Sequence, residues 1–310
     1  MVIDIVDRSS QPHAFSNRQM VGWLAVFLSA FCFYFATVII RWSEAYVAID
    51  TSFFVFARFF LGFVVVCTTL AITGRRVRPM NYHYLLGRTV ANSVAVFFFY
   101  RAVAVGSVAQ ANILNMTYPL FVALFSWFLI KEQRDPVALP IVGLACAGVY
   151  LVLAPGLASV EWNNLWGLGS GIMAAAAMMY LNLSRRFHDS QTILFYMFGL
   201  GSLFMLLFFH RSIHLPTAME WYFLLSCSVA GVIGQYLLTY GFLFVTALEG
   251  SIISSGRILL AAMLGTVLVG EPALGATGWL GALLIFVANS ALAWRRSVVS
   301  SVEVLSLIHI

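Results

Sequence analysis

The chain has 310 residues, of which 62% are hydrophobic and only 9% are charged, and its formal net charge is +5. A soluble domain typically carries about 25% charged residues, so this composition excludes a water-soluble globule and indicates an integral membrane protein. The positive charge does not indicate nucleic-acid binding, because only one of the seventeen cations is a lysine and no long basic run occurs.

Ten apolar segments follow one another along the chain. A transmembrane helix needs roughly 20 such residues to cross about 30 Å of hydrocarbon, and Gly, Pro and Trp residues mark the ends of the segments. We therefore expect an all-α membrane protein with ten transmembrane helices, at residues 21–40, 52–73, 84–105, 107–130, 136–154, 164–185, 190–209, 219–243, 249–269 and 275–294.

The two halves of the chain repeat one another. Residues 107–133 align without a gap on residues 246–272, and each stretch ends near a glutamate, Glu132 or Glu271. Residues 21–42 similarly align on 166–187. This pattern is typical of transporters with internal repeats. It divides the chain into a segment at 1–20, five-helix repeats at 21–154 and 164–294, and a tail at 295–310.

Charged loops predict the orientation in the membrane. The loops on the side of both termini hold most of the arginines, including Arg75, Arg76 and Arg78, whereas the opposite loops hold little more than Arg41 and Arg211. The positive-inside rule then places both termini in the cytoplasm. Because five helices per half is an odd number, the second repeat must run upside down relative to the first.

Small residues at corresponding places in the two halves predict close helix packing. Gly143 with Ala147, and Gly278 with Ala282, each form a face of the kind that lets helix backbones approach. We expect contacts within the chain, and a homodimer interface is left open.

The repeats, the glutamates and the short turns at 105–113 and 245–253 resemble the EamA-type branch of the drug/metabolite transporter superfamily. Pro119 stands where that family usually has a proline in its fourth helix, and Ile258 departs from the pattern in the ninth. The resemblance implies a transporter fold rather than a substrate. The aromatic stretch at 97–107 is most similar to aromatic amino-acid exporters of the YddG type.

Polar side chains inside apolar segments are the candidate substrate contacts, because they are costly in lipid and usually face a central path. For each of them, a hydrogen bond between helices is an equally good interpretation. The candidates are Asn92, Phe99, Tyr100, Asn112, Asn115, Tyr118, Gln235, Tyr240, Ser254 and Arg257.

Arg257 is the deepest cation, and the repeat register pairs it with Tyr118. A substrate carboxylate is one way to satisfy its charge, and Glu249, two turns away, is another. Arg58 and Arg88 lie nearer the helix ends, where we expect their head groups to reach water. Glu132 and Glu271 are expected to be partners of helix ends rather than substrate ligands.

No sequence motif for a nucleophile, a phosphate loop or a metal site is present, and the four cysteines lie in apolar segments without CxxC spacing. We therefore expect no cofactor, no metal and no enzyme activity. The expected function is export of small amphipathic metabolites, above all aromatic or bulky apolar amino acids, across a bacterial-type inner membrane. We expect facilitated diffusion by alternating access. The alternatives are a proton-coupled exporter and, in another class, a membrane-embedded enzyme or scaffold.

The predicted topology can be tested by accessibility. Single cysteines placed near Arg76 and near Glu161, in a background lacking the four native cysteines, should react with an impermeant thiol reagent from opposite faces. Reaction of both from the periplasmic side would overturn the ten-helix arrangement.

Overall fold

The computed structural model describes residues 17–129, 136–154, 162–245 and 247–308. All regular structure in these ranges is helical, which confirms the expected class. The helices are α1 (Asn17–Ser43), α2 (Thr51–Thr73), α3 (Tyr82–Val105), α4 (Val108–Asn115), α5 (Tyr118–Leu129), α6 (Ala138–Leu153), α7 (Leu165–Ser184), α8 (Ser190–Phe209), α9 (Ala218–Gly241), α10 (Ala247–Ser255), α11 (Arg257–Leu264) and α12 (Ala276–Ile308), with a π-helical turn η5 (Gly265–Val269) and short 3-10 turns η3 (Trp162–Asn164) and η4 (His210–Ser212).

Seven helical stretches of the described chain are long and apolar enough to cross a membrane, and α6 is a shorter apolar helix. Helices α3 and α7 are not among the seven, because Arg88, Arg101 and Asn92 lower the hydropathy of α3, and α7 contains several glycines. These two helices pack along one another, so each shields part of the other. The ten expected segments correspond to ten helical stretches, two of which are interrupted.

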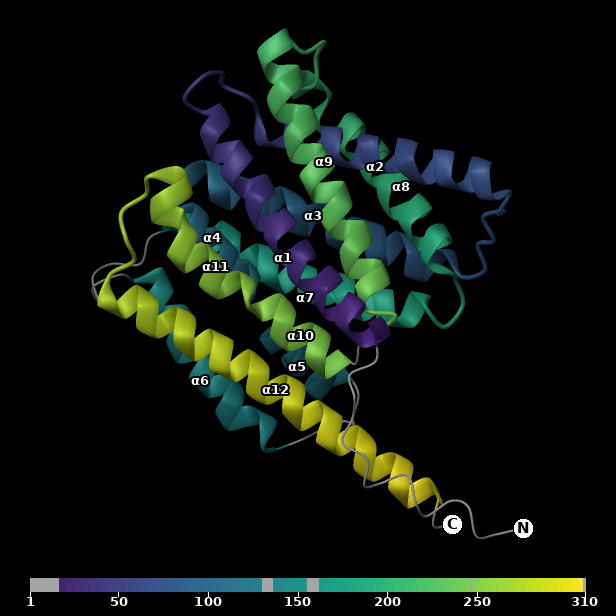
Figure 1. The fold of residues 1–310 in the computed structure, drawn as a ribbon, viewed down its shortest axis with the longest axis vertical. Helices are drawn as coiled ribbons and strands as arrows, with labels where there is room; N and C mark the ends of the chain where they lie inside the picture. The colour runs from purple at the N-terminus through teal and green to yellow at the C-terminus, as the bar shows by residue number, and fades with distance from the viewer. Residues whose placement is uncertain (1–16, 130–135, 155–161, 246, 309–310) are drawn as a thin grey trace.

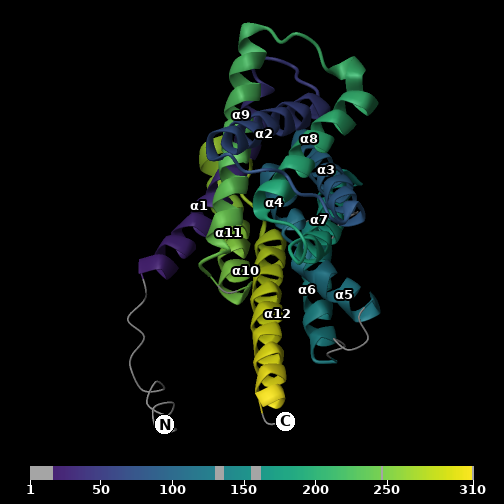
Figure 2. The same ribbon diagram turned by 90° about the vertical axis from the view of Figure 1, so that its right-hand side faces the viewer.

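The helix contacts have two-fold character. Helix α1 packs along α9, and its repeat counterpart α7 packs along α3, the counterpart of α9. Helix α2 likewise contacts α8, and α6 contacts α12, each pair being two equivalent elements (Figures 1 and 2). Exchanging the two repeats therefore preserves these pairings, as expected for halves related by a pseudo-two-fold axis.

Both interrupted helices break at the same position of the repeat. Helix α4 ends at Asn115 and α5 begins at Tyr118, while α10 ends at Ser255 and α11 begins at Arg257. Tyr118 and Arg257 are the two residues that the repeat register aligns. Helices α5 and α11 therefore begin at equivalent positions of the two repeats.

Different residues cause the two breaks. Pro119 has no N–H, and its ring excludes the helical position of the carbonyl four residues earlier, at Asn115. The second break falls at Gly256, which costs about 1 kcal/mol in a helix relative to alanine. The carbonyl of Met116, freed at the first break, accepts a bond of 2.8 Å from Asn289 Nδ2 on α12.

Helices α6 and α12 approach most closely at Gly148 and Gly281. A Cβ added to Gly281 would lie 2.7 Å from the Gly148 carbonyl oxygen, and one added to Gly148 would lie 2.8 Å from that of Gly281. Gly143 has open space instead, and Gly278 meets only Leu274, just before the start of α12. The small residues thus pack helices within the chain, as expected, but through Gly148 and Gly281 rather than through Gly143 and Gly278.

The tail expected at 295–310 is not a separate element up to residue 308. Helix α12 continues without a break to Ile308, and its last turns project beyond the other helices (Figures 1 and 2). The expected N-terminal segment 1–20 overlaps α1, which begins at Asn17, and its first sixteen residues lie outside the described part.

Substituting Gly281 by alanine should lower the thermal unfolding temperature of the purified protein. The new methyl group would force α6 and α12 apart, and overpacking of this kind costs about 1–3 kcal/mol. Gly143→Ala is the matched control, since that position is open and the unfolding temperature should change little. Equal unfolding temperatures for wild type and Gly281→Ala would show that this crossing does not need a glycine.

Candidate functional site

The candidate site is centred on Arg257, the first residue of α11. Its side chain is 5% exposed, and its Nη2 donates a hydrogen bond to Asn115 Oδ1 at the end of α4. Asn115 Nδ2 in turn donates to Ser170 Oγ on α7 at 2.9 Å. The two helix breaks, one from each repeat, are therefore joined by one side-chain pair.

Aromatic rings surround this pair. The Arg257 guanidinium carbon lies 5.2 Å from the centre of the Phe99 ring on α3 and 6.0 Å from that of Phe33 on α1. At such distances the ring quadrupole attracts a cation. Arg257 thus has an amide oxygen and two ring faces around it.

A second arginine lies at the same Phe33 ring. The guanidinium carbon of Arg58, on α2, is 5.2 Å from the ring centre, and its Nη1 donates to the Tyr100 hydroxyl at 3.0 Å. Cys227 Sγ on α9 also lies 3.8 Å from that hydroxyl. Phe33 therefore connects the predicted residues Phe99, Asn115 and Arg257 with a second cluster around Tyr100.

The expectation that Arg58 and Arg88 reach water is wrong. Both side chains are 5% exposed. Arg58 is the eighth residue of α2, about 11 Å from its start at 1.5 Å per residue, and α9 covers it. Its place as the eighth residue of an apolar helix could have indicated this burial from the sequence.

Two glycines of α9 make room for this cluster. A Cβ added to Gly231 would lie 2.8 Å from Arg58 Nε, and one added to Gly234 would lie 3.1 Å from the Phe33 ring. Neither Phe33 nor these glycines were predicted from the sequence as part of the site. Phe33 is one of 27 phenylalanines, so its position in the sequence does not distinguish it.

No carboxylate that the structure describes balances the charge at this site. Neither Arg58 nor Arg257 forms an ion pair with any Asp or Glu side chain that the structure describes, and the Nε of each is buried without a hydrogen-bond partner. An arginine at the bilayer centre costs about 3 kcal/mol or more unless it is paired or hydrated. The side chain of Glu249 lies outside the described part. The site is therefore strongly attractive to an anion.

Of the other six predicted residues, Asn112, Tyr240 and Tyr118 each have a described interaction. Asn112 is fully buried and joins α4 to α1 through Thr37 Oγ1 at 3.1 Å, a helix contact. Tyr240 is 42% exposed and accepts from Gln191 Nε2 at 2.9 Å, with no described contact to Arg257. Tyr118 interacts electrostatically with Arg257.

The remaining three predicted residues lie on helices near the arginines, and no described hydrogen bond joins their side chains to Arg58 or Arg257. Gln235 is 8% exposed and follows Gly234 on α9. Ser254, also 8% exposed, is three residues before Arg257, and its Oγ has no partner. Asn92 is half-buried on α3, two turns before Phe99.

Glu271 is a helix-end partner, as expected. Its two carboxylate oxygens accept from Ser107 Oγ at 2.8 Å and from the Val108 N–H at 2.9 Å, at the start of α4. Arg41 Nη2 lies 3.4 Å from the same carboxylate. An anion at a helix N-terminus is favoured by the helix dipole. The corresponding Glu132 lies outside the described residues.

A cavity of about 780 Å³ opens beside this ion pair and away from the central arginines. Arg41, Trp42, Glu44, Tyr46, Tyr222 and Phe223 are among its lining residues. Trp42 Nε1 also donates to the Leu268 carbonyl at 2.7 Å, so the end of α1 is tied to η5. The cavity therefore lies where α1 and η5 end and α9 begins.

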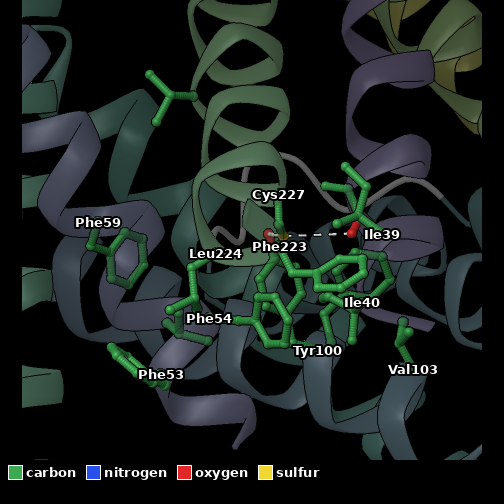
Figure 3. Packing of buried hydrophobic residues seen from close by; sticks show 14 of the residues in the cluster. Ile39, Ile40, Phe53, Phe54, Phe59, Tyr100, Val103, Phe223, Leu224 and Cys227 are labelled. Carbon is green, nitrogen blue, oxygen red and sulfur yellow. Dashed lines mark hydrogen bonds between the residues drawn. The ribbon is translucent and has the colours of Figure 1, made fainter. Parts of the chain in front are cut away.

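The site lies between two hydrophobic clusters. One cluster is built mainly from α1, α2, α3, α8 and α9 and includes Phe54, Tyr100 and Cys227, as the close-up of Figure 3 shows. The other comes mainly from α4, α5, α6 and α12 and contains Leu120. Arg58 and Phe33 extend from helices of the first cluster, and Asn115 from a helix of the second. The arrangement brings two guanidiniums and aromatic rings together, and no group of three metal-ligating side chains occurs among the described residues.

Known proteins with similar sequences are transporters. The model of the EamA-like transporter family matches residues 20–154 and 161–293. An uncharacterized transporter of Archaeoglobus fulgidus is 29% identical over 89% of this chain and 97% of its own length. The pseudopaline exporter CntI of Pseudomonas aeruginosa is 25% identical, over 71% of this chain and 78% of its own. Human solute carrier family 35 member G1 is 24% identical, over 58% and 53%.

A solved structure supports the fold. A crystal structure at 18% identity matches 90% of this chain and 97% of its own with a TM-score of 0.56, which bears on the fold alone. The two family matches coincide with the two five-helix repeats and together cover most of the chain. The chain is a multi-pass membrane transporter rather than an enzyme, and it belongs to the EamA-like transporter family.

Proposed function

We propose that this transporter exports small amphipathic metabolites that carry a carboxylate, in the first place aromatic or bulky apolar amino acids. The observation that carries the proposal is the buried Arg257 guanidinium, which Asn115 holds and no described carboxylate neutralises. A substrate carboxylate is the natural counter-ion for such a group, since charged partners form the stronger hydrogen bonds.

The rings beside the arginines support an aromatic or bulky apolar side chain. Phe33, Phe99 and Tyr100 gather around the guanidiniums from α1 and α3. Apolar walls with a few placed polar groups are typical of sites for small ligands. This arrangement supports the resemblance to aromatic amino-acid exporters of the YddG type.

The two hydrophobic clusters support alternating access. Each is packed as a unit, and the candidate site lies between them, where polar contacts replace continuous apolar packing. At 5% exposure, Arg58 and Arg257 become accessible to a substrate only when these units move apart. Relative motion of two such bodies about a central site is the common transport mode of inverted-repeat carriers.

The cellular setting completes the proposal. The loop arginines favour a bacterial-type inner membrane with both termini in the cytoplasm. A homodimer stays an open prediction, because the open face at Gly143 is available to a second copy but nothing in the chain requires one.

Transport is expected to be facilitated diffusion. Coupling to protons needs a group inside the bilayer that gains and loses charge, and arginine does not deprotonate in proteins. No Asp or Glu side chain that the structure describes pairs with the two central arginines. Glu249, two turns before Arg257 in the sequence, is the one carboxylate that could change this conclusion.

Replacing Asn115 or Gln235 by alanine should weaken transport of aromatic amino acids into liposomes that contain only this protein. Asn115→Ala removes the acceptor that orients Arg257, and loss of a hydrogen bond to a charged group costs about 1.5–3 kcal/mol. Initial rates against substrate concentration would measure the effect. Asn182→Ala, at an exposed position of α7, should match wild type. Unchanged kinetics in both test variants would move the site elsewhere, and the absence of saturable flux in wild type would refute the proposed function.

The energy source can be tested in the same liposomes. At equal volumes, an imposed pH gradient or an uncoupler should leave the final substrate distribution unchanged, because no described carboxylate pairs with the central arginines. Accumulation against a gradient that is abolished by an uncoupler and by Glu249→Gln would show proton coupling through that glutamate. Asp50→Asn, at an exposed helix cap, is the control for loss of an acid elsewhere.

A further inference from the structure

Arg58 and Arg257 place two positive charges at one ring. The guanidinium carbons of Arg58 and Arg257 lie 5.2 Å and 6.0 Å from the centre of the Phe33 ring, so one ring contacts both cations, and both side chains are 5% exposed. Like charges repel more strongly in a low-dielectric interior than in water. A single carboxylate would neutralise one of the two and leave the other uncompensated.

The partners of both arginines are neutral and leave part of each guanidinium unbonded. Arg58 uses Nη1 to bond the Tyr100 hydroxyl, and Arg257 uses Nη2 to bond the Asn115 amide oxygen. In each, Nε is buried with no partner. In Arg58 the unbonded Nε lies on the same edge as Nη2, and two parallel N–H groups on one edge are the geometry that binds a carboxylate through both of its oxygens once α9 no longer covers that edge.

The helices hold both groups in place. Gly231 and Gly234 of α9 lie against Arg58 and Phe33, so that neither glycine can carry a side chain without displacing them. Asn115 is itself fixed by Ser170 at 2.9 Å. The Arg58 and Arg257 head groups are thus positioned before any ligand arrives, which lowers the entropy cost of binding.

From this geometry we infer that the substrate carries two anionic groups: a small dicarboxylate with an apolar or aromatic body, one carboxylate on Arg257 and the other on Arg58, with Phe33 between them. The inference rests on the proposed function and narrows its substrate class. Arg257 is the carboxylate anchor common to all substrates, and Arg58 selects for the second acid. No described acidic side chain at the arginines competes with either carboxylate.

A matched pair of ligands tests this inference on the unmodified protein. N-benzoyl-glutamate and N-benzoyl-glutamine have the same size and aromatic body, but only the first has a second carboxylate. Binding to the purified chain in lipid nanodiscs, measured by calorimetry, should be at least about tenfold tighter for the glutamate compound, since a site built around a polar group discriminates against the analogue that lacks it. Equal affinities would overturn the inference, whatever the variants do.

Variants assign the preference to Arg58. Arg58→Gln should remove the difference by weakening N-benzoyl-glutamate about tenfold while N-benzoyl-glutamine stays within about twofold, and Arg257→Gln should weaken both ligands. Arg101→Gln is the matched control, because Arg101 adjoins Tyr100 on α3 but is exposed. Retention of the preference in Arg58→Gln would refute the role given to Arg58.

The two proposals fail separately. Saturable liposome flux of phenylalanine together with equal affinities for the ligand pair would leave amino-acid export standing and remove the dicarboxylate inference. A clear preference for N-benzoyl-glutamate without flux of any aromatic amino acid would support the two-anion site and refute the proposed substrates.

Discussion

The hydrogen bond between Arg257 and Asn115 is the contact on which the centre of the structure depends. It joins the first residue of α11 to the last residue of α4, and these two helix ends come from opposite repeats. A guanidinium buried in a membrane protein needs a partner, because leaving it unpaired in a low-dielectric interior costs several kilocalories per mole. Asn115 supplies an oriented but uncharged partner, so the geometry is fixed while the charge remains for a ligand.

The inverted duplication explains why this contact is central. Equivalent elements of the two repeats meet one another, and both interrupted helices break at the residue pair Tyr118 and Arg257. The same geometry arises from different chemistry, since Pro119 removes a backbone donor in one half and Gly256 weakens the helix in the other. The breaks free backbone groups from the helical hydrogen bonds, and the freed Met116 carbonyl accepts from Asn289 Nδ2 instead.

At one end of the bundle, the Glu271 carboxylate satisfies the N-terminus of α4 and pairs with Arg41. Through these bonds the end of the second repeat is tied to the first, beside an aromatic-lined cavity. The central arginines and this terminal ion pair therefore use charge in opposite ways. No described carboxylate pairs with the central arginines. The Glu271 carboxylate, by contrast, neutralises Arg41 and holds helices together.

Much of this arrangement followed from the sequence. Composition, segment length and the repeat register predicted an all-helical membrane chain, its two halves and the alignment of Tyr118 with Arg257, because lipid imposes length and apolarity on each helix independently of its neighbours. Asn115, Phe99 and Tyr100 were predicted to face a central path, and they lie on α3 and α4, which contact one another. These properties depend on local periodicity and spacing, which a sequence displays directly.

Only the tertiary structure decided which polar groups meet. Arg58 was expected at the water boundary but lies against Gly231 of α9, and Phe33 was indistinguishable from the other phenylalanines until two guanidiniums were found at its ring. Asn112, with the same spacing signal as Asn115, bonds Thr37 instead. The rotation of each helix about its axis sets these contacts, and packing against distant helices determines that rotation, so it is not encoded in the pattern of any one segment.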